Sequence, residues 1–276
     1  MSEQQVGPKT IVITGAARGI GLATARILAT RGNRVVMSDL DGELAAAEAE
    51  KIGDRAAGFG VDVTDRDAVR EHLEMVEREF GPVDVMINNA GIASASPNIL
   101  EQDPKITERT IDINLKGAMN GTIEAIRLME PRRRGQVVNV ASLAGIIGVK
   151  GLAAYSASKF GLVGFTESIR LEFADKGIKL TCVMPGPVDT GMMDGTSSSP
   201  LVSMLAPEEM ATGIADAVTT GKPRVSLPRS SWLLARTISV LPPAIGIRVG
   251  HWTRIDRIYT EIDPAARAAY EQRISR

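Results

Sequence analysis

Short apolar runs alternate with amphipathic stretches over the first 228 residues. The runs are four to six residues long and rich in β-branched side chains, which is typical of buried strands. In the stretches between them, apolar residues recur at helical spacing. The pattern predicts strands over residues 10–14, 34–38, 56–61, 83–88, 136–141, 179–184 and 224–227. It predicts helices from residue 21 to about residue 30 and over 43–52, 65–80, 106–129, 153–174 and 207–219.

Strictly alternating strands and helices predict a parallel sheet, and strands that are apolar on both faces predict helices on both sides of it. With right-handed connections the result is an α/β fold, a doubly wound parallel seven-stranded Rossmann sheet. No repeat, low-complexity tract or linker divides this part, so we take residues 1–228 as one domain. Residues 229–276 follow as a C-terminal helical extension with basic and apolar character.

Bulk composition is that of a globular protein and excludes several classes of function. Hydrophobic residues make up 44% of the 276, which is ample for a core. The net charge of −1 provides no overall basic field for nucleic acid. The single cysteine, Cys182, rules out an internal disulfide framework and suits a reducing compartment. Because we find neither a signal-peptide pattern nor a long uninterrupted apolar span, we expect a cytoplasmic protein.

Three glycines stand where the first predicted strand passes into the first helix: Gly15, Gly19 and Gly21. Glycine permits a tight turn and lets the backbone approach a ligand closely. The positive end of the helix that follows suits a pyrophosphate. In this strand–helix context the spacing predicts a dinucleotide site, which also includes Arg18 and Ile20; the alternative is a tight turn without a ligand.

The end of the second predicted strand bears on the choice of cofactor. Asp39 lies there and can accept hydrogen bonds from the adenosine ribose hydroxyls, whereas it would repel a 2′-phosphate. Arg18 favours the opposite choice, since its cation could meet a 2′-phosphate. A carboxylate facing a phosphate is the costlier conflict, so we expect NAD rather than NADP. Asp62 and Val63 follow the third strand at the expected adenine edge, although Asp62 could equally belong to an ordinary strand–helix loop.

Tyr155 and Lys159 form the chemically most informative pair. Residues four apart in a helix share one face. An unperturbed tyrosine has a pKa of about 10 and is a poor base at neutral pH. A lysine ammonium beside it, and the positive end of the helix that begins just before it, are expected to lower that pKa. Taken alone, the spacing is also what two unrelated surface side chains would show.

Other segments supply the context that this pair lacks. Several segments occur in order and at suitable spacing: Thr14-Gly15-x-x-x-Gly19-Ile20-Gly21, Asp62-Val63, Asn88-Asn89-Ala90-Gly91, Asn114, Ser142, Tyr155-x-x-x-Lys159 and Pro185-Gly186. Through these segments the chain resembles, over about residues 8–228, the short-chain dehydrogenase/reductase family, conventional subfamily. The resemblance implies an NAD(P)-dependent oxidoreductase that acts on CH–OH and C=O groups.

The resemblance also implies catalytic roles. Tyr155 would be the general acid/base, and Ser142 would hydrogen-bond the substrate oxygen. Lys159 would lower the tyrosine pKa and hold the nicotinamide ribose, and Asn114 would hold a water that extends a proton relay. With the residues discussed above, the candidate cofactor-binding set is Gly15, Arg18, Gly19, Ile20, Gly21, Asp39, Asp62, Val63, Asn89, Ala90, Gly91, Tyr155, Lys159, Pro185, Gly186, Val188 and Thr190.

We expect no metal site. Hydride transfer leaves only a proton to be moved, and the two histidines, His72 and His251, are too far apart in sequence to suggest a metal site or a Ser-His-Asp triad. Two alternatives to an enzyme remain on the same fold: a non-catalytic dinucleotide sensor or scaffold, and a membrane-associated lipid-binding protein. A non-catalytic protein would be free to lose Tyr155 or Lys159, so their presence favours the enzyme.

The segment between Asp189 and Pro207 is long for a connection and predicts a lid. Apolar residues that could line a pocket beneath it are Met192, Met193, Leu201, Met204 and Leu205, with Ile146, Ile147 and Val149 after Ser142. We therefore expect a secondary alcohol or ketone on a hydrophobic skeleton, such as a steroid, terpenoid, retinoid or acyl chain. The same residues could instead pack the lid on the body.

Charge is distributed unevenly along the chain. Residues 222–276 hold ten Lys/Arg and four Asp/Glu, whereas residues 1–221 hold 22 and 29. The basic, apolar stretch 229–255 contains Trp232 and Trp252 and could make peripheral contact with an anionic membrane surface. We favour a helical cap that packs on the body or on a neighbouring subunit. The resemblance implies a homodimer or homotetramer formed through the helices at 106–129 and 153–174.

Overall fold

Residues 7–197, 204–253 and 255–275 are described by the structure, which is a computed structural model. Seven strands form one sheet in the order β3-β2-β1-β4-β5-β6-β7, and every neighbouring pair is parallel. The strands are β1 (Thr10–Thr14), β2 (Arg34–Asp39), β3 (Ala56–Gly60), β4 (Val83–Asn88), β5 (Gly135–Val140), β6 (Ile178–Pro185) and β7 (Arg224–Leu227). The predicted Rossmann sheet is confirmed.

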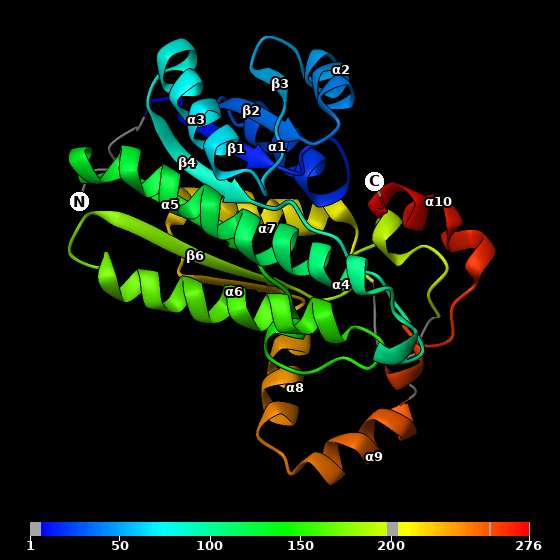
Figure 1. Cartoon of the computed structure of the whole chain (residues 1–276). Helices are drawn as coiled ribbons and strands as arrows, with labels where there is room; N and C mark the ends of the chain where they lie inside the picture. Colours follow the sequence, from blue (N-terminus) through cyan, green and yellow to red (C-terminus); the bar gives the residue numbers. More distant parts are fainter. Residues whose placement is uncertain (1–6, 198–203, 254, 276) are drawn as a thin grey trace.

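Helices cover both faces of this sheet (Figure 1). One face carries α1 (Gly19–Thr30), α2 (Gly42–Ile52) and α7 (Pro207–Thr220). The other carries α3 (Arg66–Phe80), α4 (Pro104–Ile111), α5 (Ala118–Met129) and α6 (Ala153–Glu172). Short 3₁₀ turns lie at Ile99–Glu101, Glu130–Arg132, Leu143–Gly145, Gly191–Met193 and Ile255–Arg257.

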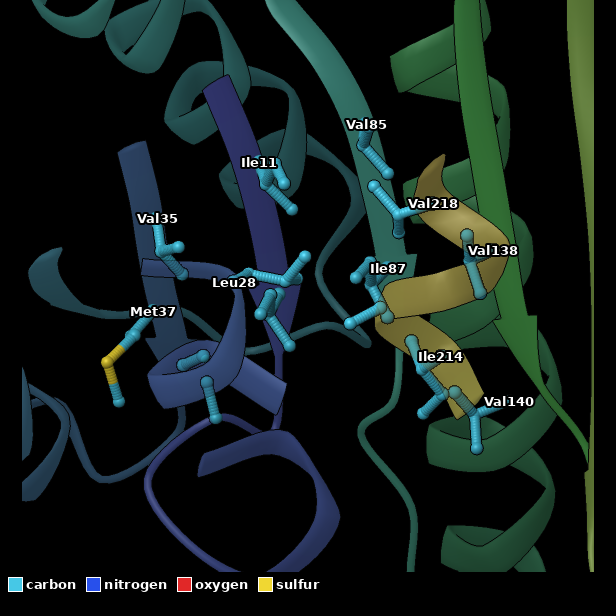
Figure 2. Close-up of a cluster of buried hydrophobic side chains, with 14 of the residues drawn as sticks. Ile11, Leu28, Val35, Met37, Val85, Ile87, Val138, Val140, Ile214 and Val218 are labelled. Carbon is cyan, nitrogen blue, oxygen red and sulfur yellow. The ribbon is translucent and has the colours of Figure 1, made fainter. Parts of the chain in front are cut away.

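Each face of the sheet has its own hydrophobic core. Successive strand residues point to opposite faces, so β1 gives Ile11 to one core and Val12 to the other. Figure 2 shows the first core, in which strand residues such as Ile11 and Val138 meet Leu28 of α1 and Ile214 of α7. These cores fix the sheet, and with it the positions of the loops at the ends of the strands.

Aspartates define where several helices begin. The carboxylates of Asp41, Asp65, Asp103 and Asp263 accept backbone N–H groups in the first turns of α2, α3, α4 and the C-terminal helix α10 (Pro264–Ile274). In α4 and α10 a proline follows the capping aspartate, as is usual at a first helical position. Helix α1 differs, because its N-cap residue Arg18 makes no side-chain capping hydrogen bond.

The single helix predicted over roughly 106–129 differs from the structure in two details. It begins earlier, at Pro104, and a π-helical turn (Asp112–Gly117) separates α4 from α5. Such a turn adds a residue to the helical repeat and is frequent at functional sites. Here it contains Asn114, which is fully buried.

The C-terminal segment makes three further helices and returns to the body. Helices α8 (Arg229–Ser239) and α9 (Pro243–Thr253) project away from the sheet, whereas α10 lies beside the loops near α4 (Figure 1). Ile274 and Tyr270 of α10 pack on Ile106 of α4. Among the described residues, no helix is both long and apolar enough to cross a membrane.

Candidate active site

The carboxyl ends of the strands open into a cleft of about 1310 Å³. The order of the strands reverses between β1 and β4, and ligands of open α/β sheets bind at such switch points. The cleft brings together nearly all of the predicted site residues: Gly15, Arg18, Gly19, Ile20, Asp39, Asp62, Val63, Asn89, Ala90, Gly91, Ser142, Tyr155, Lys159, Pro185, Gly186, Val188 and Thr190. Gly21 and Asn114 are not on its surface and lie behind it.

The glycine loop needs its glycines for two different reasons. Gly15 and Gly19 have φ angles of 63° and 54°, a conformation that side chains disfavour. A Cβ on Gly15 would also lie 2.7 Å from the Cα of Ala90. Gly21 has an ordinary backbone, but a Cβ there would lie 2.3 Å from the Gly15 carbonyl oxygen. Gly21 therefore allows the loop to pack closely and does not face the cleft.

The start of α1 is suited to an anionic group. The first N–H groups of a helix have no partner within it, and α1 lacks the side-chain cap that aspartates provide in α2, α3 and α4. These N–H groups begin at Gly19, on the surface of the cleft. The residues present thus fit the pyrophosphate of a dinucleotide.

Asp39 and Arg18 have different partners at the far end of the cleft. The Asp39 carboxylate accepts the backbone N–H groups of Ala17 at 3.0 Å and Asp41 at 3.1 Å. Arg18 instead forms an ion pair with Asp41, with 2.9 Å between Nη2 and Oδ2. The Asp62 carboxylate accepts the backbone N–H and the hydroxyl of Thr64, so it shapes its own loop.

Hydrogen bonds from β1 hold the segment after β4. The side-chain amide of Asn89 donates to the carbonyls of Thr14 and Gly15, each at 3.0 Å. The Thr14 hydroxyl accepts the backbone N–H groups of Asn89 at 3.1 Å and Ala90 at 3.2 Å. These four bonds join the segment after β4 to the end of β1, where the order of the strands reverses.

Tyr155 and Lys159 of α6 meet Ser142 on one wall. Lys159 Nζ lies 5.5 Å from the centre of the Tyr155 ring and donates to the Val140 carbonyl at 2.9 Å. Burial raises the pKa of the Tyr155 hydroxyl, and a hydrogen bond with Ser142 acts in the opposite direction. The lowered tyrosine pKa expected from the sequence is therefore wrong for this structure, because loss of hydration penalises the phenolate more than one hydrogen bond stabilises it.

Lys159 is itself perturbed by its surroundings. The residue is 4% exposed, and burial lowers the pKa of its ammonium to about 8, against a smaller opposing effect of Cys182. With this pKa the Lys159 ammonium is still mostly protonated at pH 7. A buried cation thus lies beside the tyrosine and can stabilise negative charge that develops there.

Asn114 lies directly behind this wall. Its Oδ1 accepts the Ile92 N–H at 2.8 Å, and its Nδ2 donates to the Ile92 carbonyl at 2.8 Å and to the Ser158 hydroxyl at 3.1 Å. A Cβ on Gly91 would lie 3.2 Å from Asn114 Oδ1 and 3.6 Å from Lys159 Nζ. The Asn114 side-chain amide and the Lys159 ammonium therefore both lie close to the Gly91 backbone.

The lid residues are only partly placed as expected. Four of the apolar residues line the cleft: Ile147, Val149, Met192 and Met193. Ile146 and Leu205 pack into hydrophobic clusters instead, and Met204 is exposed. Leu201 lies outside the described residues.

The C-terminal segment also forms part of the cleft, which was not predicted. Tyr259 lines the same cleft as Tyr155, and burial and, next, the charge of Tyr155 raise the pKa of Tyr259. The Tyr259 hydroxyl donates to the Met193 sulfur at 3.5 Å. Leu234 and Ile238 of α8 and Tyr270 and Ile274 of α10 add to the same lining. No local sequence pattern marks these residues, because their partners are far away in the chain.

Arg267 fastens α10 across the cleft. Its side chain is 3% exposed and donates to the carbonyls of Ala93 at 2.7 Å, Asp194 at 3.1 Å and Met192 at 3.2 Å. Its Nε lies 2.6 Å from the Glu271 carboxylate. One buried guanidinium therefore joins the loop after β4, the loop after β6 and the C-terminal helix.

A doubly wound sheet with a dinucleotide-sized cleft at its switch point defines a class of nucleotide-dependent α/β proteins. Residues 9–200 match the short chain dehydrogenase family profile. The chain belongs to the short-chain dehydrogenase/reductase family. Members of this family use nicotinamide dinucleotides and act on small alcohols and ketones.

Curated relatives agree with this assignment. The chain is 37% identical to cis-4-hydroxycyclohexanecarboxylate dehydrogenase of Sinomonas cyclohexanicum, over 75% of this chain and 88% of the relative. It is 35% identical to 3beta-hydroxysteroid dehydrogenase 2 of Eggerthella lenta, over 81% of this chain and 88% of the relative. The 3-oxoacyl-[acyl-carrier-protein] reductase FabG of Thermotoga maritima is also 35% identical, over 74% and 87%. The crystal structure of gox2181 superposes with a TM-score of 0.73 and 26% identity, covering 82% of this chain and 97% of that one. The chain is thus an oxidoreductase of CH–OH and C=O groups.

Proposed function

We propose that the chain transfers hydride between NAD and a secondary alcohol or ketone carried on a hydrophobic skeleton. The observation that supports this most directly is the setting of Tyr155. Its hydroxyl and that of Ser142 lie in a cleft that Ile147, Val149 and Met193 also line. A polar pair in one cleft with apolar side chains suits an alcohol on a ring or chain.

Tyr155 is the proposed proton carrier. When bound, a nicotinamide supplies the hydride acceptor or donor. In the oxidative direction the Tyr155 phenolate takes the alcohol proton as the C–H bond breaks and becomes the phenol, and in the reductive direction the phenol gives its proton to the carbonyl oxygen. Ser142 donates a hydrogen bond to the same substrate oxygen and stabilises the charge that develops on it.

Lys159 and Asn114 are proposed to support this step. The Lys159 ammonium, 5.5 Å from the centre of the Tyr155 ring, is proposed to stabilise the phenolate while Tyr155 lacks its proton, and also to hold the nicotinamide ribose. Asn114 is proposed to hold a water beyond Lys159, and the short separation across Gly91 supports that route. Thr190 is proposed to contact the nicotinamide carboxamide, and its position against Gly19 is consistent with that role.

NAD is the proposed cofactor in preference to NADP. Arg18, the cation of the glycine loop, is already paired with Asp41. Asp39 places a second carboxylate on the same part of the cleft, where a 2′-phosphate would meet it. Both features favour ribose hydroxyls over a phosphate.

The relatives support the hydrophobic skeleton. Two of them are named as dehydrogenases of a hydroxycyclohexanecarboxylate and of 3β-hydroxysteroids, both of which carry the hydroxyl on a ring. We propose a ring alcohol of this kind, and a steroid or terpenoid before an acyl chain.

A panel of alcohols and ketones tests the proposal, with turnover followed by nicotinamide absorbance. The panel contains substituted cyclohexanols, hydroxysteroids, terpenoid alcohols, 3-hydroxyacyl thioesters and polyols, each with NAD and with NADP. We expect the highest kcat/KM for an apolar ring alcohol with NAD. Turnover of polyols alone, or a preference for NADP, would contradict the proposal.

Homo-oligomers are also proposed, as the family resemblance implies. Phe160 and Leu171 are large apolar residues on α6 that are 45% and 80% exposed in the single chain. Their exposure supports an interface on this helix. Light scattering is expected to give a dimer or tetramer, and a monomer would contradict it.

A further inference from the structure

Helices α8 and α9 form a pair, residues 229–253, that we call the α8–α9 hairpin. It extends from the end of β7 to one side of the body, beyond α6 (Figure 1). Twelve large hydrophobic side chains are exposed among the described residues, and six of them lie in this hairpin: Leu233, Leu234, Val240, Ile245, Ile247 and Trp252. Single exposed apolar residues are ordinary, but a cluster of six on one short projection marks a contact surface.

The outer face of the hairpin combines apolar and cationic side chains. Leu233 of α8 and Val240, the residue that follows α8, lie seven positions apart and therefore on the same face of the helix. They are 63% and 76% exposed. Arg236 is exposed between them, and Arg248 is exposed on α9 four residues before Trp252, which is 84% exposed. The whole surface is therefore amphipathic, with tryptophan and arginine side by side.

Acidic residues are missing from this part of the sequence. From Ala217 to Ile255 the sequence contains no aspartate or glutamate, but it has Lys222, Arg224, Arg229, Arg236, Arg248 and Arg254. The surrounding chain is acidic, since residues 1–221 hold 22 basic and 29 acidic residues. Three of these cations, Arg229, Arg236 and Arg248, belong to the hairpin itself, whereas Arg224 precedes it on β7 and is paired with Glu167. The hairpin therefore carries arginines and no carboxylate among its exposed apolar side chains.

The inner face of α8 is part of the cleft. Ser231, Leu234, Ala235 and Ile238 line it. A surface against which the hairpin rests would therefore lie next to the apolar end of the candidate active site. This connects the exposed face with substrate entry.

We propose that the α8–α9 hairpin docks on an anionic lipid surface, so that the apolar end of the cleft opens toward the bilayer. A headgroup layer provides negative charge for the arginines, and its boundary with the acyl chains accepts tryptophan and aliphatic side chains. To bind this hairpin instead, a second copy of the chain would need an acidic and apolar surface of matching shape. Lipids need no such preformed surface, because they rearrange around the hairpin. Docking on lipid does not depend on the proposed reaction. Only the delivery of an apolar substrate from the bilayer rests on the proposed function.

Co-sedimentation of the full-length protein with vesicles tests the proposal. Vesicles of phosphatidylglycerol and phosphatidylcholine in equal parts are compared with vesicles of phosphatidylcholine alone. We expect binding to the anionic vesicles that weakens as salt is added. The double variant Trp252→Ser/Ile247→Ser is expected to bind about tenfold or more weakly. The double variant Arg236→Gln/Arg248→Gln is expected to lose about fivefold per arginine.

Leu100→Ser serves as the matched control, because Leu100 is 93% exposed and lies outside the hairpin. It is expected to bind vesicles as the wild type does. NAD affinity is measured for every variant to show that the body is folded, and light scattering gives its assembly state. Absence of binding to anionic vesicles, or equal loss in Leu100→Ser, would overturn the proposal. So would a hairpin variant that dissociates the oligomer, since the surface would then contact a second copy.

Turnover of a water-soluble alcohol separates this proposal from the proposed function. Hairpin variants that keep full turnover in solution but no longer bind vesicles would support docking whatever the physiological substrate is. An inactive wild type that binds anionic vesicles would contradict the proposed reaction and leave the docking supported.

Discussion

The body (residues 7–197 and 204–228) and the C-terminal segment (residues 229–253 and 255–275) both line the cleft, but they hold their side chains in place by different means. In the body, Tyr155 and Lys159 stand on a long helix packed on the sheet, and Asn89 is fixed by backbone partners on β1. In the C-terminal segment, Tyr259 lies between helices, and α10 is fastened chiefly by Arg267 and Tyr270. The comparison suggests that the body sets the chemistry and the segment sets the shape of the substrate pocket. The two contributions should therefore be separable by substitution.

Removal of the Arg267 guanidinium should have the largest effect on the segment. Arg267→Met leaves three carbonyls and the Glu271 carboxylate without their donor, which we expect to lower the free energy of local opening of α10 by about 3 kcal/mol. Hydrogen exchange of the amides in 264–274 and in the loop at 189–194 should accelerate, while exchange in β1 and β4 stays unchanged.

Arg273→Met is the matched control on the same helix. Arg273 is exposed and lies 5.0 Å from the centre of the Tyr270 ring, with the same residue type but little burial. Exchange in α10 should change little in this variant. If both variants accelerated exchange equally, or if β1 opened with α10 in Arg267→Met, the segment would not be a separate unit.

Acid should destabilise the body through its buried histidine, His72. Burial lowers the pKa of His72 to about 4, while its ring contacts the Ser38 hydroxyl at 2.8 Å. Below pH 6.5 His72 binds a proton in the unfolded chain but stays neutral in the folded chain. The free energy of unfolding therefore falls as the pH drops toward 4. From pH 7 to pH 4.5 this should remove about 2.5 kcal/mol.

Urea unfolding at the two pH values measures this loss. His72→Gln keeps a hydrogen-bonding group and should lose about 2.5 kcal/mol less than the wild type over the same interval. Equal losses in the wild type and His72→Gln would show that the buried histidine does not carry the acid response of the body.

Cofactor choice should depend on the body alone and show the smallest effect. Asp39→Ser removes the carboxylate expected to face a 2′-phosphate and should shift the ratio of kcat/KM for NAD and NADP by about tenfold toward NADP. Asp41→Ser, which frees Arg18, should shift it in the same direction. The KM for the alcohol should be unchanged in both, and a shift in that KM alone would place Asp39 outside the cofactor site.

Periodicity was sufficient for the body, because its strands and helices bury continuous apolar faces. It missed the π-helical turn at Asn114, since one added residue hardly alters a helical pattern. It also could not place the C-terminal segment. The Arg267 side chain meets the Ala93 carbonyl across 174 positions of sequence, and no local pattern encodes such a contact. The tyrosine pKa was misjudged for a related reason, because burial depends on the complete fold.

Two tyrosines in one cleft, Tyr155 of the body and Tyr259 of the C-terminal segment, give the most direct test that the body sets the chemistry and the segment sets the shape of the substrate pocket. Steady-state kinetics and NAD affinity are measured for Tyr155→Phe and Tyr259→Phe, each of which removes one hydroxyl from a half-buried ring. Tyr155→Phe should lower kcat about 1,000-fold and leave the Kd for NAD within about twofold. Tyr259→Phe should keep kcat within about threefold and alter mainly the KM for the alcohol. Equal losses of kcat in the two variants, or an active Tyr155→Phe enzyme, would contradict the account.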